Sequence, residues 1–209
     1  NSRMQKVLVI LGPTATGKTD LALLLAKKFN GEIVACDSRQ IYKGLDVGTG
    51  KYPSSDCVVE KDNGYWLING IKIWMYDVVD LTVQYTVATY VKDVSKIIDQ
   101  IHAREKLPII VGGTGFYLKA LLEGIDSLAI PINQELREEL TKLTAKQLQE
   151  KLQKEFPNKW EKMNNSDKQN PRRLIRLIEI SMNPYTDRVK SSEFRVQNWD
   201  VLKIGLIAP

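Results

Sequence analysis

A glycine-rich stretch near the N-terminus constrains the fold of this chain more than any other feature. It fits the pattern G-x-x-x-x-G-K-[ST] and consists of Gly12, Pro13, Thr14, Ala15, Thr16, Gly17, Lys18 and Thr19. The apolar residues 7–11 before it predict a buried strand, and residues 21–29 after it predict a helix. A strand, a glycine-rich loop and a helix N-terminus form a pocket of backbone N–H groups that face phosphate oxygens. We therefore predict a phosphate-binding loop, with Lys18 on the outer phosphate oxygens and the Thr19 hydroxyl on a Mg²⁺ ion.

Composition limits the classes of protein to which the chain can belong. With 209 residues, 43% of them hydrophobic, it can bury one sizeable core and a smaller lobe. No apolar run is long enough to span a bilayer, and Cys36 and Cys57 are too few for a disulfide framework, so we expect a cytoplasmic protein with reduced thiols. The single histidine, His102, argues against a histidine-based metal site. The net charge of +5 fits a polyanionic partner, although a solvated basic surface gives the same balance.

Two further strands are predicted to reach the same edge of the sheet as the phosphate-binding loop. Residues 32–36 are predicted to form a strand that is followed by Asp37, and residues 108–111 lead directly into a second glycine-rich turn at 112–115. Parallel strands joined by helices present their carboxyl ends at one edge, where α/β proteins bind ligands. The predicted fold class is therefore α/β, a P-loop NTPase-like parallel sheet flanked by helices, with a ligand held between the two glycine-rich turns.

The segment between these strands contains a loop and a hairpin. Residues 41–51 are too rich in glycine for a long helix, which favours a functional loop. Residues 65–68 and 71–74 flank Asn69-Gly70, a strong β-hairpin signal. We expect the aromatic side chains of this hairpin to pack onto the core, and contact with a partner is the alternative. Residues 76–79 are then expected to form a short strand.

The chain changes character after residue 125. Helices are predicted from Asn133 to residue 143, from a capping box at Thr144, and from Asn170 with Pro171 in the first turn. The last apolar run reads as a strand that returns to the sheet. We predict three segments: a core of residues 1–125 with a hairpin insertion near 60–75, a helical insertion lobe of residues 126–196, and a returning core strand within residues 197–209.

Four blocks of the sequence resemble one family, the tRNA dimethylallyltransferases, which are also called tRNA isopentenyltransferases. The blocks are the phosphate-binding loop, DSRQIYKGLDVGTGK at 37–51, VGGTGFYLKALLEG at 111–124 and RRLIR at 172–176. They come in the family's order, and the second and third are rarely seen outside it. The resemblance covers nearly the whole chain.

The resemblance implies a reaction and a set of partners. Family members transfer a dimethylallyl group from dimethylallyl diphosphate to N6 of the adenosine 3′-adjacent to the anticodon in tRNA, and they release diphosphate. Their fold is a P-loop α/β core with a helical lobe that binds the anticodon stem-loop. A loop with Lys18, Thr19 and Mg²⁺ as cofactor suits a diphosphate that must be held and neutralised as it leaves. We expect tRNA and dimethylallyl diphosphate as partners, no membrane, and a monomer.

The resemblance also implies roles for single residues. Asp37 is the general base that binds the adenine N6, and Thr114 lies beside the transferring diphosphate and the target base. Besides Asp37, the positions that match tRNA contacts are Ser38, Arg39, Gln40, Arg137, Arg172, Arg173, Leu174, Ile175 and Arg176. The match at Arg137 requires one extra residue before it. Simpler structural roles remain open: a helix cap or structural acid for Asp37, a cap for Thr114, and a solvated helix face for the arginines.

The chain departs from the family pattern in three ways, one of which is that Arg39 stands at a position where members vary. Most bacterial members have a His-His pair where this chain has residues 73–77, which contain no histidine and follow the predicted hairpin. Family members are usually longer, and the segment beyond the last strand normally supplies further helices, more tRNA contacts and an arginine near the diphosphate. The resemblance therefore implies a C-terminally truncated chain, in which the diphosphate site can remain intact while activity is weak or absent.

Two other functions are compatible with parts of the sequence. A P-loop small-molecule kinase, with ATP in the pocket, explains the phosphate-binding loop but not the block at 37–51. A truncated, non-catalytic tRNA-binding protein would retain tRNA without chemistry. ATP turnover without prenyl transfer would favour the kinase.

Overall fold

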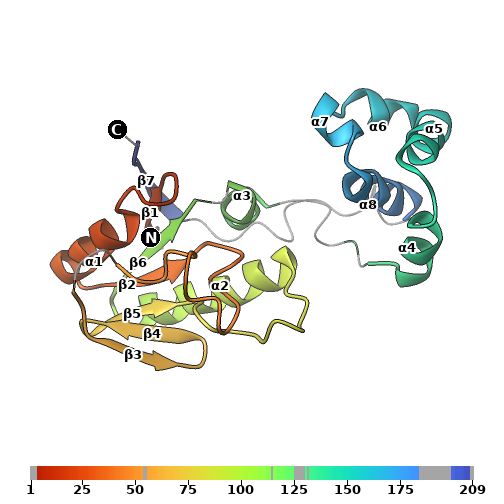
Figure 1. Ribbon diagram of the computed structural model, residues 1–209. Coiled ribbons are helices and arrows are strands. Elements are labelled where there is room, and N and C mark those ends of the chain that lie inside the picture. The colour runs from red at the N-terminus through yellow and green to blue at the C-terminus, as the bar shows by residue number, and fades with distance from the viewer. Residues whose placement is uncertain are drawn as a thin grey trace. The chain divides into compact units, whose positions relative to one another are not determined.

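Figure 1 shows a computed structural model of the chain, which describes residues 4–53, 56–113, 115–124, 130, 132–183 and 199–207. The chain forms two compact units, Asn1–Gly124 together with Arg195–Pro209, and Ile125–Phe194. We call the first the sheet unit and the second the helical unit. Each has buried hydrophobic residues of its own. No helix in the described part of the chain is long and apolar enough to cross a membrane.

The sheet unit is built on one sheet, whose described strands lie in the order β3-β4-β5-β2-β6-β1-β7. They are β1 (Gln5–Leu11), β2 (Gly31–Ala35), β3 (Val59–Asp62), β4 (Tyr65–Ile68), β5 (Ile71–Trp74), β6 (Leu107–Gly112) and β7 (Trp199–Gly205). Strands β5, β2, β6, β1 and β7 are parallel, whereas β3 and β4 are antiparallel to their neighbours. The predicted α/β fold class is confirmed. Strand β6 lies between β1 and β2, and β7 is the predicted returning strand.

Three helices are described in the sheet unit: α1 (Lys18–Phe29), α2 (Val87–Ala103) and α3 (Gly115–Glu123). Helix α1 packs against β1, β2 and β6, and α2 packs against β6 and α3. Helix α2 begins where predicted, because the Thr86 side chain accepts a hydrogen bond from the Thr89 N–H. Its apolar stripe, buried at Val91, Val94 and Ile98, recurs at the three- and four-residue spacing of one helix face. The helix is therefore held by packing on the sheet.

The predicted hairpin is present and extends the sheet. Asn69 and Gly70 have φ angles of 50° and 76°, so both turn residues are left-handed, as a type I′ turn requires. Strand β5 then pairs in parallel with β2, with Ile73 opposite Ile33. Trp66 on β4 is fully buried, so this aromatic side chain packs onto the core, as favoured by the sequence.

Some expectations about local structure were wrong. Residues 76–79 do not form a strand, because Met75 and Asp77 have φ angles of 71° and 53°, and Val79 makes only an isolated bridge to Tyr42. Strand β3 was not predicted, because its sequence VEKD is mostly polar. The helix predicted to reach residue 143 ends earlier, with Thr141 as its C-cap.

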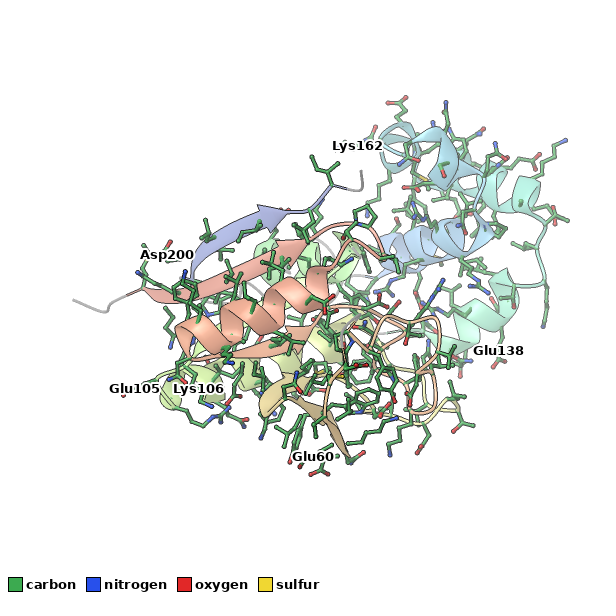
Figure 2. All side chains as sticks on the ribbon, turned by 60° about the vertical axis from the view of Figure 1, so that its left-hand side comes forward. Glu60, Glu105, Lys106, Glu138, Lys162 and Asp200 are labelled. Atoms are coloured by element: carbon green, nitrogen blue, oxygen red, sulfur yellow. The ribbon has the colours of Figure 1, made fainter. Side chains whose placement is uncertain are left out.

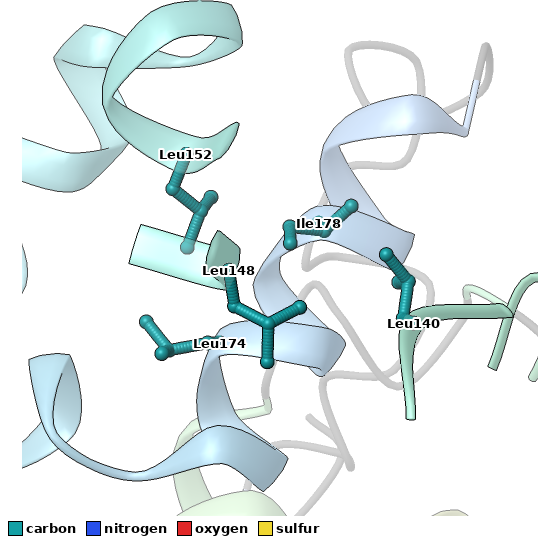
Figure 3. Packing of buried hydrophobic residues seen from close by; sticks show 5 residues of the cluster. All are labelled: Leu140, Leu148, Leu152, Leu174 and Ile178. Atoms are coloured by element: carbon teal, nitrogen blue, oxygen red, sulfur yellow. The ribbon is translucent and has the colours of Figure 1, made fainter. Parts of the chain in front are cut away.

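The helical unit contains short, capped helices around a small leucine-rich core. The described helices are α4 (Gln134–Leu140), α5 (Ala145–Glu155), α6 (Pro157–Glu161), α7 (Asn165–Lys168) and α8 (Pro171–Met182). The predicted caps are present: Asn133 begins α4, Thr144 forms a capping box with Gln147, and Asn170 begins α8. Figure 3 shows the residues packed between these helices, which are Leu140, Leu148, Leu152, Leu174 and Ile178.

Charged side chains cover the outside of both units. Figure 2 labels exposed examples, including Glu60, Glu105 and Asp200 on the sheet unit and Glu138 and Lys162 on the helical unit. The described polar or charged residues that are buried are Glu32, Gln40, Lys51 and Glu179. All four form hydrogen bonds, as buried polar groups must.

Candidate active site

A cavity of about 380 Å³ opens at the carboxyl edge of the parallel strands of the sheet unit. The phosphate-binding loop and the start of α1 form one side, through Thr14, Ala15, Gly17, Lys18, Thr19 and Asp20. The ends of β2 and β6 contribute Asp37, Gly112 and Gly113. The two glycine-rich turns and the predicted base therefore lie around one cavity.

Lys18 and Asp37 lie within electrostatic reach of each other. Burial lowers the pKa of the Lys18 ammonium, and the negative charge of Asp37 opposes that shift. The Lys18 ammonium also contacts the Pro13 carbonyl, and the Thr16 hydroxyl donates a hydrogen bond to the same carbonyl at 2.8 Å. The loop thus holds a cation on one side of the cavity, with a carboxylate available to the same space.

The backbone on both sides of Asp37 is fixed. The Cys36 N–H donates to the Val111 carbonyl at 2.7 Å, and the Tyr90 hydroxyl donates to the Ala35 carbonyl at 2.9 Å. After the strand, Asp37 Oδ1 accepts a hydrogen bond from the Arg39 N–H at 2.8 Å. The carboxylate therefore leaves the sheet at a defined position on the edge of the cavity.

Gly112 permits the close approach of β6 to the end of β2. A Cβ atom at this position would lie 2.1 Å from the Cys36 carbonyl oxygen, which no side chain could tolerate without movement of the backbone. Burial raises the pKa of the Cys36 thiol to about 12, so this cysteine is a neutral packing residue, as the sequence indicated.

Part of the cavity lining is apolar. We call it the apolar floor, and it consists of Ile33, Ala35, Ile73, Tyr76 and Val111. The cavity is also lined by a loop that we call the cavity wall, formed by Gly48, Thr49, Gly50, Tyr52 and Pro53. Gln40 holds this wall, because its Nε2 donates to the Thr49 carbonyl at 2.8 Å. The cavity can therefore accept a ligand with a charged head and an apolar tail.

The donor set of the cavity fits a hard cation that is bound mainly through its ligand. Thr19 and Asp37, whose side chains carry oxygen atoms, both line the cavity. In the described part of the chain, no group of three or more His, Cys, Asp or Glu residues could hold a metal ion by itself. Mg²⁺ often takes only one or two protein ligands and completes its octahedron with phosphate oxygens and water. These residues therefore suit Mg²⁺ beside a bound diphosphate.

The neighbouring positions of the predicted site differ in exposure. Ser38 is half-buried, Arg39 is exposed, and Gln40 is buried with only 8% of its surface exposed. Thr114 lies outside the described residues, so its role stays a prediction. Gly113, directly before it, lines the cavity.

In the helical unit, two of the predicted arginines share one buried carboxylate. Glu179 on α8 accepts from Arg137 Nε and Nη2 at 3.0 and 2.9 Å and from Arg176 Nη1 at 2.6 Å. The Asn133 N–H also donates to this carboxylate, at 2.7 Å. Burial by itself raises the pKa of Glu179, but these donors outweigh it and hold the pKa below its ordinary value. We call this arrangement the Glu179 clamp.

The other residues of the RRLIR block have different surroundings. Arg172 and Arg173 are exposed, and Arg173 also contacts the Asp167 carboxylate. Leu174 is fully buried in the core of the helical unit, and Ile175 packs partly against it. The block therefore combines exposed cations with residues that hold the helix in place.

Three charged residues that are buried in the described part of the chain, Glu32, Lys51 and Glu179, were not identified as buried from the sequence. Glu179 stands three residues after Arg176, and this spacing was the available signal. Lys51 is fully buried between Asp46 and Asp77, which lie 5 and 26 residues away, so no local pattern indicated it.

The fold and the cavity define a class of protein: a P-loop α/β protein whose site suits a phosphorylated ligand. A family model described as IPP transferase matches residues 40–209, and one described as isopentenyl transferase matches residues 5–72. The chain belongs to the IPP transferase family, as its resemblance to the tRNA dimethylallyltransferases indicated.

Individual relatives give the same result. The tRNA dimethylallyltransferase of Endomicrobium trichonymphae is 39% identical over 182 residues, which are 87% of this chain and 58% of that protein. The tRNA dimethylallyltransferase of Leuconostoc mesenteroides is 40% identical, over 99% of this chain and 64% of that protein. A crystal structure of a eukaryotic dimethylallyltransferase acting on tRNA is 28% identical with a TM-score of 0.74, and the match covers 98% of this chain and 49% of that one. The chain thus spans about three fifths of the length of these curated relatives.

Proposed function

We infer that the protein transfers a dimethylallyl group from dimethylallyl diphosphate to N6 of the adenosine 3′-adjacent to the anticodon in tRNA, with release of diphosphate. The names of its curated relatives support this reaction. The observation that carries the proposal is the composition of the cavity, which joins a phosphate-binding loop, a carboxylate and an apolar floor. In a diphosphate with a short hydrocarbon tail, the diphosphate matches the phosphate-binding loop and the tail matches the apolar floor.

The residues of the cavity divide the chemistry between them. The diphosphate lies against the backbone N–H groups of the loop and the Lys18 ammonium, and the dimethylallyl group lies on the apolar floor. The bond between the allylic carbon and the diphosphate oxygen breaks, and a bond from that carbon to adenine N6 forms. Asp37 accepts the proton that N6 loses, and Lys18 neutralises charge on the departing diphosphate. Mg²⁺, held by the Thr19 hydroxyl, would supply further neutralisation when bound.

Recognition of the tRNA is assigned to residues outside the loop. We propose that Ser38, Arg39 and Gln40 meet the target nucleotide, which must leave its stack to reach the cavity, with Thr114 beside it. We propose that the helical unit binds the anticodon stem through Arg172 and Arg173, whose exposed guanidinium groups can reach phosphates.

We propose that Arg137 and Arg176, which form the Glu179 clamp, also contact the tRNA. Arg137 and Arg176 keep part of their side chains exposed, at 28% each, while Glu179 orients them. Leu174 and Ile175 support the helix that carries the cations. We also propose that the protein acts as a monomer in the cytoplasm, where the free thiols of Cys36 and Cys57 stay reduced.

A prenyl-transfer assay tests the proposal. The 209-residue chain is mixed with Mg²⁺, dimethylallyl diphosphate and an anticodon stem-loop that carries the target adenosine, and the mass of the RNA is measured. We expect a gain of one dimethylallyl unit, which is lost in Asp37→Asn. The control Asp200→Asn, at an exposed carboxylate on β7, should retain the gain. Hydrolysis of ATP without any change in RNA mass would instead identify a kinase-like activity and overturn the proposal.

A further inference from the structure

Lys51 is a fully buried cation within the cavity-wall segment. Its ammonium donates to Asp77 Oδ1 at 2.7 Å, to Asp46 Oδ1 at 3.0 Å and to the Tyr42 carbonyl at 2.9 Å. Three acceptors match the three protons of an ammonium group, so the charge is buried with its hydrogen bonds satisfied. This arrangement ties the wall to residues on both sides of it in the sequence.

The hairpin also donates hydrogen bonds to the same two carboxylates. Trp66 on β4 donates from its indole Nε1 to Asp77 Oδ2 at 2.6 Å, and Lys61 on β3 donates to Asp46 Oδ2 at 2.6 Å. Asp77 thus receives one donor from the wall and one from the hairpin. Its left-handed backbone, with φ 53°, belongs to the bend that replaces the expected strand.

The ring of Trp66 also supports two residues that line the cavity. Its centroid lies 5.2 Å from the ring of Tyr52 on the wall and 5.2 Å from the ring of Tyr76 on the floor. Both contacts have the tilted or edge-on geometry that aromatic pairs prefer. Trp66 therefore touches the wall and the floor without lining the cavity itself.

Specific side-chain contacts hold the described part of the cavity wall. Gly48 and Gly50 bear no side chain and have φ angles of 75° and 69°, and no heavy atom lies within 4 Å of where a Cβ on Gly48 would stand. Besides the Tyr52–Trp66 ring contact, the anchors of this stretch include the Gln40–Thr49 hydrogen bond, the Thr49 hydroxyl bonds to its own loop, the Lys61 ammonium over the Tyr52 ring, and the buried ammonium of Lys51. A loop with few packing contacts depends on such anchors for its position.

We propose that Trp66 and Lys51 are positioning residues for the allylic diphosphate site: meeting at Asp77, they fix the cavity wall against the bound donor. The β3–β5 hairpin is then part of the donor site's support and not a decoration of the sheet edge. The identity of the ligand rests on the proposed function, whereas the coupling between hairpin and wall rests on the contacts alone. Prior ordering of the wall strengthens binding, because the loop loses less freedom when the ligand arrives.

A matched pair of variants separates positioning from stability. Trp66→Phe keeps an aromatic ring but removes the N–H that reaches Asp77. Trp74→Phe makes the same change at the other hairpin tryptophan, whose Nε1 donates to Glu32 Oε2 at 2.7 Å and which does not line the cavity. Both variants remove one indole hydrogen bond to a carboxylate, so both should lower the melting temperature.

The two variants should differ in their effect on the site. We expect Trp66→Phe to raise the KM for dimethylallyl diphosphate by about five-fold or more with kcat within about two-fold, because the wall holds substrate and transition state alike. Hydrogen exchange at the amides of residues 48–51 should become about ten-fold faster in Trp66→Phe and stay near wild type in Trp74→Phe. Equal effects of the two variants, or none in Trp66→Phe, would overturn the proposal.

Two further measurements keep this test separate from the proposed function. If the wild-type chain transfers no prenyl group, two measurements still distinguish the effect of Trp66→Phe from that of Trp74→Phe. They are the dissociation constant for inorganic diphosphate and the rate of hydrogen exchange at residues 48–51. Lys51→Met is the more direct change, but it leaves Asp46 and Asp77 facing a methyl group and is expected to unfold the wall. The proposal is therefore tested with Trp66→Phe and Trp74→Phe.

Discussion

Replacing Glu179 with glutamine should loosen the helical unit. The carboxylate is 1% exposed and accepts four hydrogen bonds, from Asn133, Arg176 and twice from Arg137. A glutamine oxygen in place of Oε1 keeps the Asn133 and Arg137 Nε donors. Its NH₂ group then faces Arg137 Nη2 and Arg176 Nη1, which are donors themselves, so two of the four bonds are lost.

The size of the effect follows from those two bonds. A hydrogen bond between charged groups contributes about 1.5–3 kcal/mol, which gives about 3–6 kcal/mol for the pair. Both arginine side chains are 28% exposed and can regain water, so we expect about 2–4 kcal/mol. At 1.36 kcal/mol for each factor of ten, amide exchange in α8 should become about 30- to 900-fold faster.

Hydrogen exchange of the α8 backbone, read by mass spectrometry on the full chain, measures this change directly. Glu150→Gln is the matched control, because Glu150 is an exposed residue on α5 of the same unit. Exchange in α8 that is equally fast in both variants would refute the idea that the Glu179 clamp stabilises this unit.

The same clamp predicts a pH dependence. The pKa of Glu179 lies below its ordinary value of 4.5 in the folded protein, so its stabilisation is complete above that value and disappears as the pH falls through the folded-state pKa. The difference in stability between the wild type and Glu179→Gln should therefore be constant from pH 7 to about 5 and shrink below that. Urea unfolding at several pH values measures it, and a difference that persists unchanged in acid would contradict the assignment.

Three other predictions concern the sheet unit. Iodoacetamide at pH 8 should modify the partly exposed Cys57 but leave Cys36 intact in the folded protein, because burial keeps the Cys36 thiol protonated. Mass spectrometry of the labelled peptides measures this, and a labelled Cys36 would contradict it. Gly112→Ala should lower stability by about 1–3 kcal/mol or more, while Gly115→Ala, where a Cβ meets nothing within 4 Å, should not; equal melting temperatures would contradict the close approach of β2 and β6. Lys18→Ala should weaken binding of inorganic diphosphate by about ten-fold or more in calorimetry, and unchanged affinity would exclude the loop as the anion site.

Much of the fold could be predicted because its signals are local. The phosphate-binding loop, the Asn69-Gly70 turn and the caps at Thr86, Thr144 and Asn170 each depend on a few adjacent residues. The apolar runs around them predict strands and helices, because the spacing of buried residues must match the periodicity of the helix or strand that carries them. The predictions of these features were correct because local preference and tertiary packing agree there.

The errors occurred where distant residues override local preference. Residues 76–79 look like a strand, but Asp77 turns so that its carboxylate meets Lys51 and Trp66. The arginines of α8 read as one set, yet Arg176 is held by Glu179 whereas Arg172 is exposed. Pairings of this kind depend on the folded geometry, so sequence spacing alone does not indicate them.

The position of β1 in the sheet has a consequence for how the protein is made. Strand β1 carries the phosphate-binding loop, and its two neighbours, β6 and β7, are supplied by much later parts of the chain. As the ribosome synthesises the protein from its N-terminus, one edge of this apolar strand stays unpaired until the whole helical unit has emerged. An open hydrophobic edge is a template for pairing with other chains. Until β7 has been synthesised, the nascent protein is therefore exposed to aggregation through this edge.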